Sequence, residues 1–283
     1  MKQLMNLPVT IISPKNYWFD IDFKGILQSR DLIFLFVRRD FVTFYKQTIL
    51  GPFWFFIQPL ITTLVFTVVF GKIAKLNTDG LPPFLFYMAG VVPWSYFSSC
   101  LDKTSNTFSA NAALFGKVYF PRLAVPLSIV ITNAITFCIQ FLTFLAFLFF
   151  YYQSGAAVHP SWWILLAPIL LIQMAILGLG VGLLISSLTI KYRDLTFLVG
   201  FGVQLWMYAT PIVYSITQVP VKWQWLFLLN PMAPIIETFR YAFLGGDALN
   251  ISRWLFSLPI TILIFTIGIV FFSRAEKNFM DTI

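Results

Sequence analysis

Long apolar stretches alternate with short polar ones along most of this chain. A bilayer core about 30 Å thick is crossed by roughly 20 apolar residues in a helix. Six stretches come close to that length, and we take them as the predicted transmembrane spans. They are residues 49–71, 84–101, 123–152, 162–190, 195–214 and 254–272. The pattern therefore predicts an all-α integral membrane protein, with residues 1–283 forming one transmembrane domain.

The segment before the first span, residues 25–46, has a mixed pattern. Ile33 and Val37 belong to a series of apolar residues at helical spacing, and Arg38 and Arg39 interrupt that series. This is typical of an amphipathic helix that lies in the membrane interface. A helix packed on a soluble partner has the same pattern, and one helix can do both.

The basic residues of this segment allow two interpretations. Arg38, Arg39 and Lys46 stand just before the first span. Cations in this place suit the diphosphate headgroup of a lipid-linked cargo, because guanidinium groups bind phosphate in a bidentate way. The excess of Lys and Arg on the cytoplasmic side of membrane proteins explains them equally well.

Between the second and third spans lies a charged segment, residues 102–126, which we call the docking arm. It carries Lys103, Lys117 and Arg122, with Asp102 as its only acid. Each charge at the bilayer centre costs about 2.5–3.5 kcal/mol on insertion scales, so the arm is expected in water or against a partner. Two prolines are expected to stop helices from running into the third span, namely Pro121 and Pro126. We interpret the arm as the part through which a membrane channel takes force from a separate motor protein.

The stretch between the fifth and sixth spans is apolar but interrupted. Pro231, Pro234 and the charged residues Glu237 and Arg240 divide it into pieces too short to cross. Irregular backbone at membrane depth persists only when it is buried in protein or lines a cavity. We predict a pair of short re-entrant or interfacial helices on the outer side. Glu237 and Arg240 are three residues apart and are expected to pair, either to neutralise each other or as part of an outer gate.

The distribution of basic residues predicts the orientation. Of the 19 Lys and Arg residues, 14 fall on the side that six crossings assign to both termini, and 5 fall on the other side. Cytoplasmic loops are rich in Lys and Arg, so both termini should be cytoplasmic. The expected division is a cytoplasmic N-terminal part at residues 1–48, six spans within 49–274 and a cytoplasmic tail at 275–283.

Composition supports the membrane assignment and excludes several kinds of chemistry. The chain is 59% hydrophobic and 11% charged, whereas about a quarter of the residues in a soluble domain are charged. It contains no G-x-x-x-x-G-K-[ST] motif, so we expect no nucleotide site of its own. One histidine and two separate cysteines give no expected metal site or disulfide framework. We therefore expect a transport subunit without an enzyme activity or cofactor and without nucleic-acid binding.

Aromatic residues suggest both a transport path and membrane anchors. Phe53, Trp54, Trp206 and Tyr208 lie within the predicted spans, where aromatic faces would pack against the C–H faces of sugar rings. Contact with lipid or with the protein core would explain each of them as well. Six tryptophans fall near predicted span ends, where aromatic belts are common: Trp94, Trp162, Trp163, Trp223, Trp225 and Trp254.

Two glycines predict a tight contact between helices. Gly178 and Gly182 stand one turn apart in the fourth span. This small-x-x-x-small spacing lets two helices approach closely in a membrane.

Several motifs, in order along the chain, resemble those of permeases of polysaccharide-exporting ABC transporters. They are RRD to LGPFW over residues 38–54, GKVYFPR at 116–122, KYRD at 191–194, NPMAP at 230–234 with Glu237, Phe239 and Arg240, and AEKNFMD at 275–281. The resemblance covers essentially the whole chain.

This resemblance implies properties beyond those that the residues alone predict. It implies a homodimer of six-span subunits in the bacterial inner membrane, with two copies of a separate ATPase that binds ATP and Mg. It implies export of an undecaprenyl-diphosphate-linked glycan such as O antigen. It also implies that the interfacial helix and the docking arm contact the ATPase. The candidate contact residues are Arg38, Arg39, Asn111, Phe115, Lys117, Tyr119 and Arg122.

Two other functions remain open at this point. An ABC permease of similar build could export a small amphiphile or a drug. A passive channel or secondary carrier is a third possibility, but such proteins use charged groups inside the membrane for ion coupling. The predicted spans hold almost no charged residues.

Overall fold

The computed structural model describes residues 23–46, 49–118, 120–192, 194–246 and 251–278, and no strand occurs among them. Five helical segments in this part are long and apolar enough to cross a membrane. They are Gly51–Ile73, Pro83–Ser105, Ala124–Gln153, Trp162–Thr189 and Ile251–Glu276. All five overlap predicted spans, so the expected all-helical membrane architecture is confirmed at this level.

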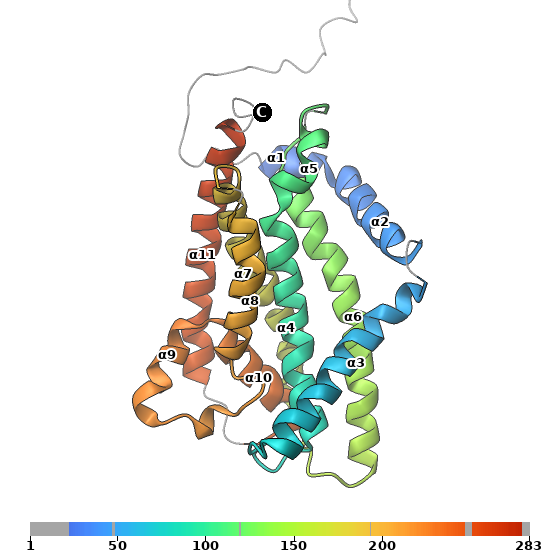
Figure 1. Ribbon diagram of the computed structural model, residues 1–283, viewed down its shortest axis with the longest axis vertical. Helices are drawn as coiled ribbons and strands as arrows, with labels where there is room; N and C mark the ends of the chain where they lie inside the picture. The colour runs from blue at the N-terminus through green and yellow to red at the C-terminus, as the bar shows by residue number, and fades with distance from the viewer. Residues whose placement is uncertain (1–22, 47–48, 119, 193, 247–250, 279–283) are drawn as a thin grey trace, which may run out of the picture.

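The helices follow one another with short connections. The first half contains α1 (Phe23–Gln28), α2 (Arg30–Lys46), η1 (Gly51–Phe53), α3 (Trp54–Phe66), η2 (Thr67–Ile73), α4 (Pro83–Ser105), α5 (Thr107–Phe115) and α6 (Ala124–Gln153). The second half contains η3 (Trp162–Leu166), α7 (Ala167–Thr189), α8 (Leu195–Tyr208), η4 (Ile216–Gln218), η5 (Val221–Trp223), α9 (Gln224–Leu229), α10 (Met232–Leu244) and α11 (Ile251–Asn278). Figure 1 shows α1, α2, α5 and the end of α11 at one end of the bundle, with α9 and α10 toward the other.

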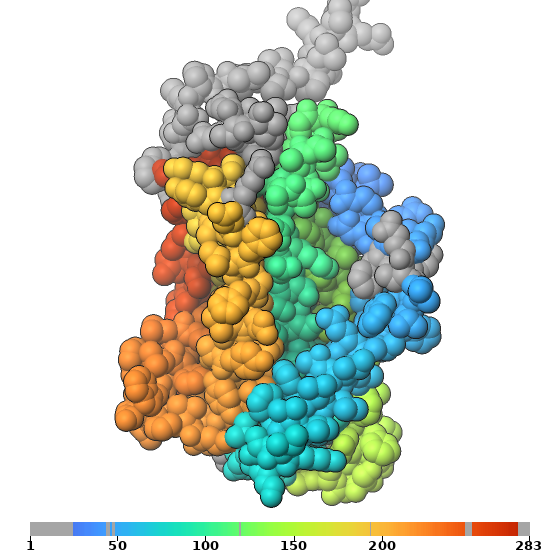
Figure 2. All heavy atoms as spheres, in the orientation of Figure 1, coloured from blue at the N-terminus to red at the C-terminus, as the bar shows by residue number. Residues whose placement is uncertain are grey.

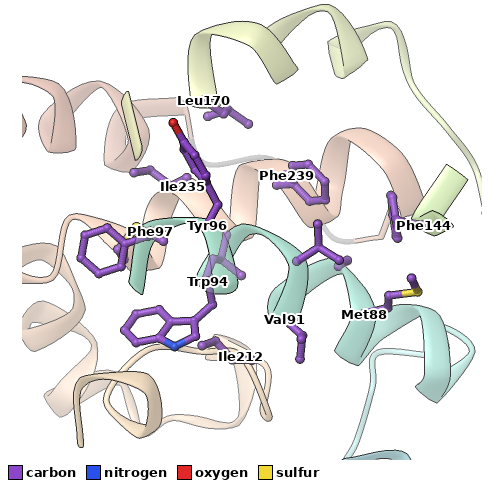
Figure 3. Packing of buried hydrophobic residues seen from close by; sticks show 14 of the residues in the cluster. Met88, Val91, Trp94, Tyr96, Phe97, Phe144, Leu170, Ile212, Ile235 and Phe239 are labelled. Carbon is purple, nitrogen blue, oxygen red and sulfur yellow. The ribbon is translucent and has the colours of Figure 1, made fainter. Parts of the chain in front are cut away.

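Helix α4 forms the centre of the bundle. In its most apolar window 78% of the residues are buried, against 22–39% for the other four candidate spans. It packs against α3, α6, α7, α8 and α10. Figure 3 shows Met88, Val91 and Trp94 of α4 among buried side chains that include Ile212 and Phe239. The core is thus arranged around one helix that neighbours cover on most sides.

Two tryptophans expected in an interfacial belt belong to the core instead. Trp94 lies near the middle of α4, is 6% exposed and meets Trp206 edge to face at 6.4 Å. Trp254 is also buried, and its indole N–H donates to the Gln173 side chain at 2.9 Å. The prediction was wrong for these two because buried indoles find partners inside this bundle, which the distance to a span end does not reveal.

Small residues bring α7 close to two neighbours, as the sequence predicted. A Cβ added to Gly178 would lie 2.9 Å from Cys100 Cβ of α4, and one on Gly182 would lie 2.6 Å from Thr104 Cβ. The opposite face of α7 is equally tight, because a Cβ on Gly268 of α11 would collide with the carbonyl of Gly180. Glycine is therefore required at these helix crossings because a side chain would not fit between the helices, and not because of an unusual backbone conformation.

The fifth predicted span, 195–214, is wrong at its C-terminal end. Helix α8 has 14 residues and ends at Tyr208. At 1.5 Å per residue this is about 21 Å, less than a bilayer core. Pro211 follows, and its lack of an N–H disfavours a continued helix. The Asn230 side chain bonds to the end of the helix instead. Its amide donates to the Ala209 carbonyl at 3.3 Å and to Thr210 Oγ1 at 2.9 Å.

The helix before the first span is present. Ser29 lies between α1 and α2, and its hydroxyl donates to the carbonyl of Gly25 at 2.8 Å. Ile33, Phe36 and Val37 of α2 are buried. The predicted apolar stripe thus packs against α6, which contacts α2 along its length.

The docking arm contains the end of α4, all of α5 and the start of α6. Helix α4 continues to Ser105, and α5 forms after a break of one residue. Helix α6 begins at Ala124, so Pro126 lies in its first turn and does not stop it. That expectation was wrong because an N–H in the first turn of a helix has no partner to lose.

Candidate functional site

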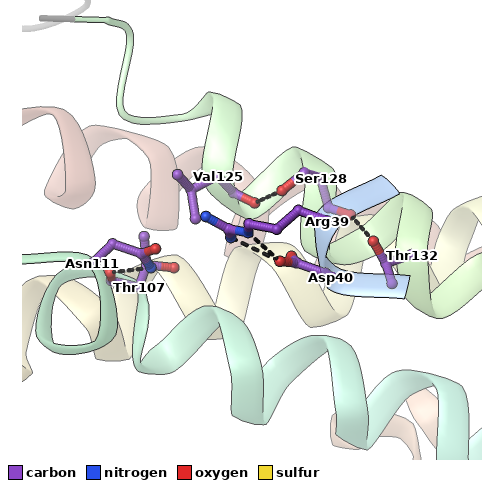
Figure 4. A network of polar contacts seen from close by, with 7 residues as sticks. All are labelled: Arg39, Asp40, Thr107, Asn111, Val125, Ser128 and Thr132. Carbon is purple, nitrogen blue, oxygen red and sulfur yellow. Dashed lines mark hydrogen bonds and ion pairs between the residues drawn. The ribbon is translucent and has the colours of Figure 1, made fainter. Parts of the chain in front are cut away.

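The docking arm meets α2, α6 and α11 at one end of the bundle. Figure 4 shows side chains of α2, α5 and α6 converging there. Asn111 adopts a non-helical backbone conformation, with φ −116° and ψ 16°, and its side chain donates to the Thr107 carbonyl at 3.0 Å. Asparagine competes for backbone groups in this way, so α5 bends at Asn111.

Five phenylalanine rings, which we call the aromatic row, connect α2 to α11 through the arm. Ring centroids lie 5.7 Å apart for Phe36–Phe120, 5.7 Å for Phe120–Phe115, 5.9 Å for Phe115–Phe108 and 4.7 Å for Phe108–Phe272. Such pairs contribute about 0.5–1.5 kcal/mol each beyond their buried area. The aromatic row therefore fixes the arm to helices on both of its sides.

A second contact ties the arm to the end of α11. The Arg122 guanidinium donates to the Glu276 carbonyl at 2.5 Å, and its backbone N–H donates to the Glu276 carboxylate at 3.3 Å. The guanidinium also lies 5.6 Å from the centroid of the buried Phe115 ring. Phe115 and Arg122 thus hold the arm in place, while Lys117 is exposed. Tyr119 lies outside the described residues.

The two arginines of α2 have different surroundings. Arg39 forms an ion pair with Asp40 at 2.7 Å, and its guanidinium lies 4.9 Å from the ring centroid of Phe36. Arg38 is exposed. Both arginines are thus at the surface, and Arg39 also lies against Phe36 of the aromatic row.

Beside α2 lies a cavity of about 680 Å³, between α2, α4 and α6. Arg39 and Asp40 line it, together with Lys103 and Asn133. The Lys103 ammonium donates to the Asn133 side-chain oxygen at 3.0 Å. The cavity thus holds two cations, one acid paired with Arg39, and neutral polar groups, at the end of the bundle where the docking arm lies.

At the other end, Arg240 does not pair with Glu237 as predicted. It is buried, and its guanidinium donates to the carbonyls of Pro211 and Ile212, both at 3.1 Å. The guanidinium carbon lies 3.7 Å from the ring centroid of Phe86. Burial lowers the pKa of Arg240 to about 10. The arginine instead fixes the irregular backbone after α8 onto α4, through charge-assisted hydrogen bonds and a cation–π contact.

Glu237 faces a different cation. One of its carboxylate oxygens lies 4.0 Å from the Arg253 guanidinium of α11, and the other has no hydrogen-bond partner in the described part of the chain. Burial raises the pKa of this carboxyl, while Arg253 and Arg240 oppose the rise. The predicted Glu237–Arg240 pair was wrong because helical spacing does not show that α10 turns Arg240 toward α4.

The two prolines of this region begin α10 and do not interrupt it. Pro231 is the residue before the helix, and Pro234 is buried in its first turn. The Asn230 side chain accepts the Met232 N–H at 3.1 Å, which caps the start of the helix. The local sequence N-P-M-A-P therefore forms a helix start, as proline at early helical positions predicts.

The four aromatic residues proposed for a transport path fall into two groups. Phe53 and Trp54 are exposed at the start of the first span. Tyr208 is exposed at the end of α8, and Trp206 is partly buried with its indole N–H donating to Asn230 at 2.9 Å. Within the described ranges, no ring contact joins the two groups.

Comparison with known proteins identifies the class. The bundle is that of a multi-pass membrane protein, and residues 31–244 match the profile of the ABC-2 type transporter family. This match covers well over half of the chain, so the chain belongs to that family and has the role of a membrane permease.

The similar proteins include permeases named for the export of polysaccharides. The chain is 30% identical over 253 residues to the O-antigen export system permease protein RfbA of Klebsiella pneumoniae, covering 89% of this chain and 94% of the relative. It is 26% identical over 222 residues to RfbA of Myxococcus xanthus, covering 78% and 83%. It is 21% identical over 264 residues to the capsule polysaccharide export inner-membrane protein CtrC of Neisseria meningitidis, covering 90% and 95%.

Sequence reasoning missed several residues of these two ends. Asn133 was not singled out, although it holds Lys103, and Glu276 was noted only as part of the motif at 275–281, although it holds Arg122. Arg253 was used only to count charges, although it faces Glu237. An asparagine within an apolar helix is itself a signal, because a buried amide needs a partner. The identity of the partner depends on helix packing.

Proposed function

We propose that this chain is the membrane subunit of an ATP-driven exporter of an undecaprenyl-diphosphate-linked polysaccharide, with O antigen as the first candidate. The substrate would cross the bacterial inner membrane. The proposal is supported by the relatives named for O-antigen and capsule polysaccharide export, which the chain covers over most of their length. A separate ABC ATPase would bind ATP and Mg, and this chain would supply the path.

The proposed assembly is a homodimer of six-crossing subunits with both termini cytoplasmic. Helix α8 and the turns after it would form the fifth of the six crossings and α11 the sixth, with α9 and α10 as short re-entrant helices between them on the outer side. Two features support this orientation. Most Lys and Arg residues lie on the proposed cytoplasmic side, and Figure 1 shows α2, α5 and the end of α11 at the same end.

In the proposed mechanism the docking arm receives force from the ATPase. Lys117, the exposed Arg38 and Arg39 of α2 and the partly buried Asn111 of α5 would contact it. The aromatic row and the Arg122–Glu276 contact would then pass the movement to α2 and α11. The connection of the arm to helices on both sides by packed phenylalanine rings is the observation that carries this step.

The substrate would be handled at both ends. The cavity beside α2 suits a phosphate headgroup because it presents the Lys103 ammonium in a partly closed space, where Arg39 is already paired with Asp40. Phe53, Trp54, Trp206 and Tyr208 are the proposed lining of the path. Helix α10, with Pro231, Pro234, Glu237 and Arg240, would form the outer re-entrant gate.

The docking role is tested by replacing residues 107–117 with a Gly-Ser linker and by the point change Lys117→Glu. Both should reduce co-purification of the ATPase with the permease and reduce the polysaccharide on the cell surface. The control is Lys72→Glu, a reversal of an exposed charge at the opposite end. If the linker variant retains both ATPase binding and export, the docking arm does not have this role.

An exported small amphiphile is a second candidate. A cavity of about 320 Å³ between α4, α7 and α8 is lined almost wholly by apolar side chains, including Leu101, Val181, Leu198 and Trp206. Such a cavity suits an aliphatic chain, whether it belongs to a lipid-linked glycan or to a small amphiphile. Deleting the gene distinguishes the two candidates. Only glycan export predicts that the polysaccharide disappears from the cell surface while lipid-linked glycan accumulates inside the cell.

A further inference from the structure

A polar cavity of about 280 Å³ lies at the end of the bundle that carries α9 and α10. Separate segments of the chain converge on it: the α3–α4 connection, the residues after α8, α9, α10 and α11. Figure 2 shows the orange segment after α8 next to the blue-green residues around the start of α4, at this end. Its charged and polar lining includes Asp79, Thr217, Gln224, Glu237, Tyr241 and Arg253.

Contacts among the lining residues fix the shape of the cavity. Thr217 Oγ1 donates to the Asp79 carboxylate at 3.1 Å, which joins the residues after α8 to the α3–α4 connection. Arg253 donates to Gln224 Oε1 at 3.2 Å, and the Gln224 amide donates to the Val219 carbonyl at 3.0 Å. The polar groups are therefore held by neighbours before any ligand arrives, which reduces the entropy cost of binding.

Two buried atoms on the cavity lining lack a hydrogen bond. Glu237 Oε1 and Arg240 Nε have no partner in the described part of the chain. Arg240 is only 7% exposed. A buried polar atom without a partner costs free energy, and these two atoms have less than 1 Å² of accessible surface. A ligand in the cavity would relieve that cost when the Glu237 or Arg240 side chain turns toward it.

We propose that this cavity binds one sugar ring of the exported glycan. Asp79 and Glu237 present carboxylate acceptors, while Arg240 and Arg253 present donors. Because the charges of the two acids and two arginines balance, the cavity suits a neutral polyol better than an ion. The Tyr241 side chain adds a hydroxyl and an aromatic face for the C–H side of the ring.

The size of the cavity fits this ligand class. Its volume corresponds to about nine liquid waters, at about 30 Å³ each, which holds one pyranose ring and leaves room for a few waters. The inference rests on the proposed function, in which the glycan leaves the membrane at this end. The cavity would then hold a sugar residue beside α10.

The test measures sugar binding by the full permease–ATPase complex in lipid nanodiscs. The probe is short oligosaccharide released by mild acid from the surface polysaccharide of the same cells. Purification uses a detergent without a sugar headgroup, because maltoside headgroups would compete for the cavity. Calorimetry or ligand-observed NMR gives the affinity.

Two variants from separate segments are used, so that if one of them fails to fold, the other still tests the proposal. Glu237→Gln and Asp79→Asn should each weaken binding about tenfold or more, the loss expected when a ligand hydroxyl loses a charged partner. Asp194→Asn, an equivalent change of an exposed acid before α8 at the opposite end, should leave the affinity unchanged. Unchanged affinity in both cavity variants, or absence of binding by the wild type, would overturn the inference.

Failure of this inference is distinguishable from failure of the proposed function. If deleting the gene removes surface polysaccharide but the complex binds no oligosaccharide, only the sugar site is wrong. If surface polysaccharide persists without the gene, the export function itself is wrong.

Discussion

At the scale of single residues, Arg240 shows how this membrane protein accommodates a buried charge. Its guanidinium has two backbone carbonyls and an aromatic face as partners, and the nearest acid, Glu237, faces Arg253. Those carbonyls belong to the turn after α8, which has left helical geometry and needs donors. The arginine is therefore part of what holds the irregular segment against α4.

Arg240→Ala should destabilise the protein by about 3 kcal/mol or more, since it removes two hydrogen bonds to a charged group and leaves two buried carbonyls unpaired. The stability of Arg240→Lys should lie between those of the wild type and Arg240→Ala. A lysine ammonium keeps the charge, but it lacks the planar guanidinium and stacks less well on the Phe86 ring. Thermal unfolding in nanodiscs measures both. The control is Arg30→Ala on α2, whose side chain is 76% exposed and which should change little.

Glu237 gives a prediction for pH. Its pKa is raised above the ordinary value of 4.5 by burial, so the folded state binds this proton more tightly than the unfolded state. The group's contribution to stability is therefore greatest at low pH and is lost as pH rises through the raised pKa. Glu237→Gln, which resembles the protonated form, should gain melting temperature relative to wild type as the pH rises from the ordinary value of 4.5. A difference that stays constant as the pH rises would contradict the assigned direction.

The residue scale is also where the sequence predicted least. The Glu237–Arg240 spacing correctly suggested one short helix, but not that the two side chains face different neighbours. Trp94 and Trp254 were assigned to an interface although both are buried. In each case the missing information was the rotation of a helix about its axis, which packing against other helices decides.

At the scale of elements, α7 shows a fold requirement that the sequence did predict. Its glycines sit at the crossings with α4 and α11 because nothing larger fits there. Gly180→Ala should cost about 1–3 kcal/mol, since the new Cβ would lie 2.7 Å from Phe265 Cα and push the helices apart.

Gly200→Ala is the matched control for that change. A Cβ on Gly200 of α8 would meet nothing within 4 Å. Alanine is favoured over glycine in a helix by about 1 kcal/mol, so this variant should be neutral or slightly more stable. Equal destabilisation by both variants would show that the crossing is looser than described.

The aromatic row predicts a separation of ATPase binding from export. Phe108→Ala removes the ring stacked on Phe272 at 4.7 Å but leaves Lys117 on the surface. The ATPase should still co-purify, while ATP hydrolysis should no longer drive export. Phe149→Ala, whose ring is 64% exposed on α6, should behave as wild type. Normal export in Phe108→Ala would contradict the role given to the row.

Element boundaries followed from the sequence where hydrophobicity alone decided them. Five long apolar helices were predicted within a few residues of their observed ends. The end of α8 was not, because the residues up to Tyr214 are as apolar as the helix itself. It is Pro211 and the Asn230 side chain that end the helix, and Asn230 is 20 residues away from Thr210 in the chain.

At the scale of the whole molecule, the two ends have different characters. One end gathers the docking arm, α2 and the end of α11, and the other gathers the irregular segment, α9 and α10. The chain belongs to the ABC-2 type transporter family. We propose that the first end binds the ATPase and that the second end forms the outer gate. The sequence predicted both regions from charge and proline content, but not the cavities that lie beside them.

The most direct test is reconstitution of the permease with its ATPase in proteoliposomes that contain fluorescently labelled lipid-linked polysaccharide. Complexes with outward-facing ATPase domains respond to external ATP and should carry the glycan into the lumen, where added glycosidase cannot reach it. The account predicts that protection of the label requires both ATP and the ATPase and is abolished by the 107–117 linker replacement. Protection of the label without the ATPase, or undiminished protection in the linker variant, would contradict the claim that the docking arm couples ATP hydrolysis to glycan export.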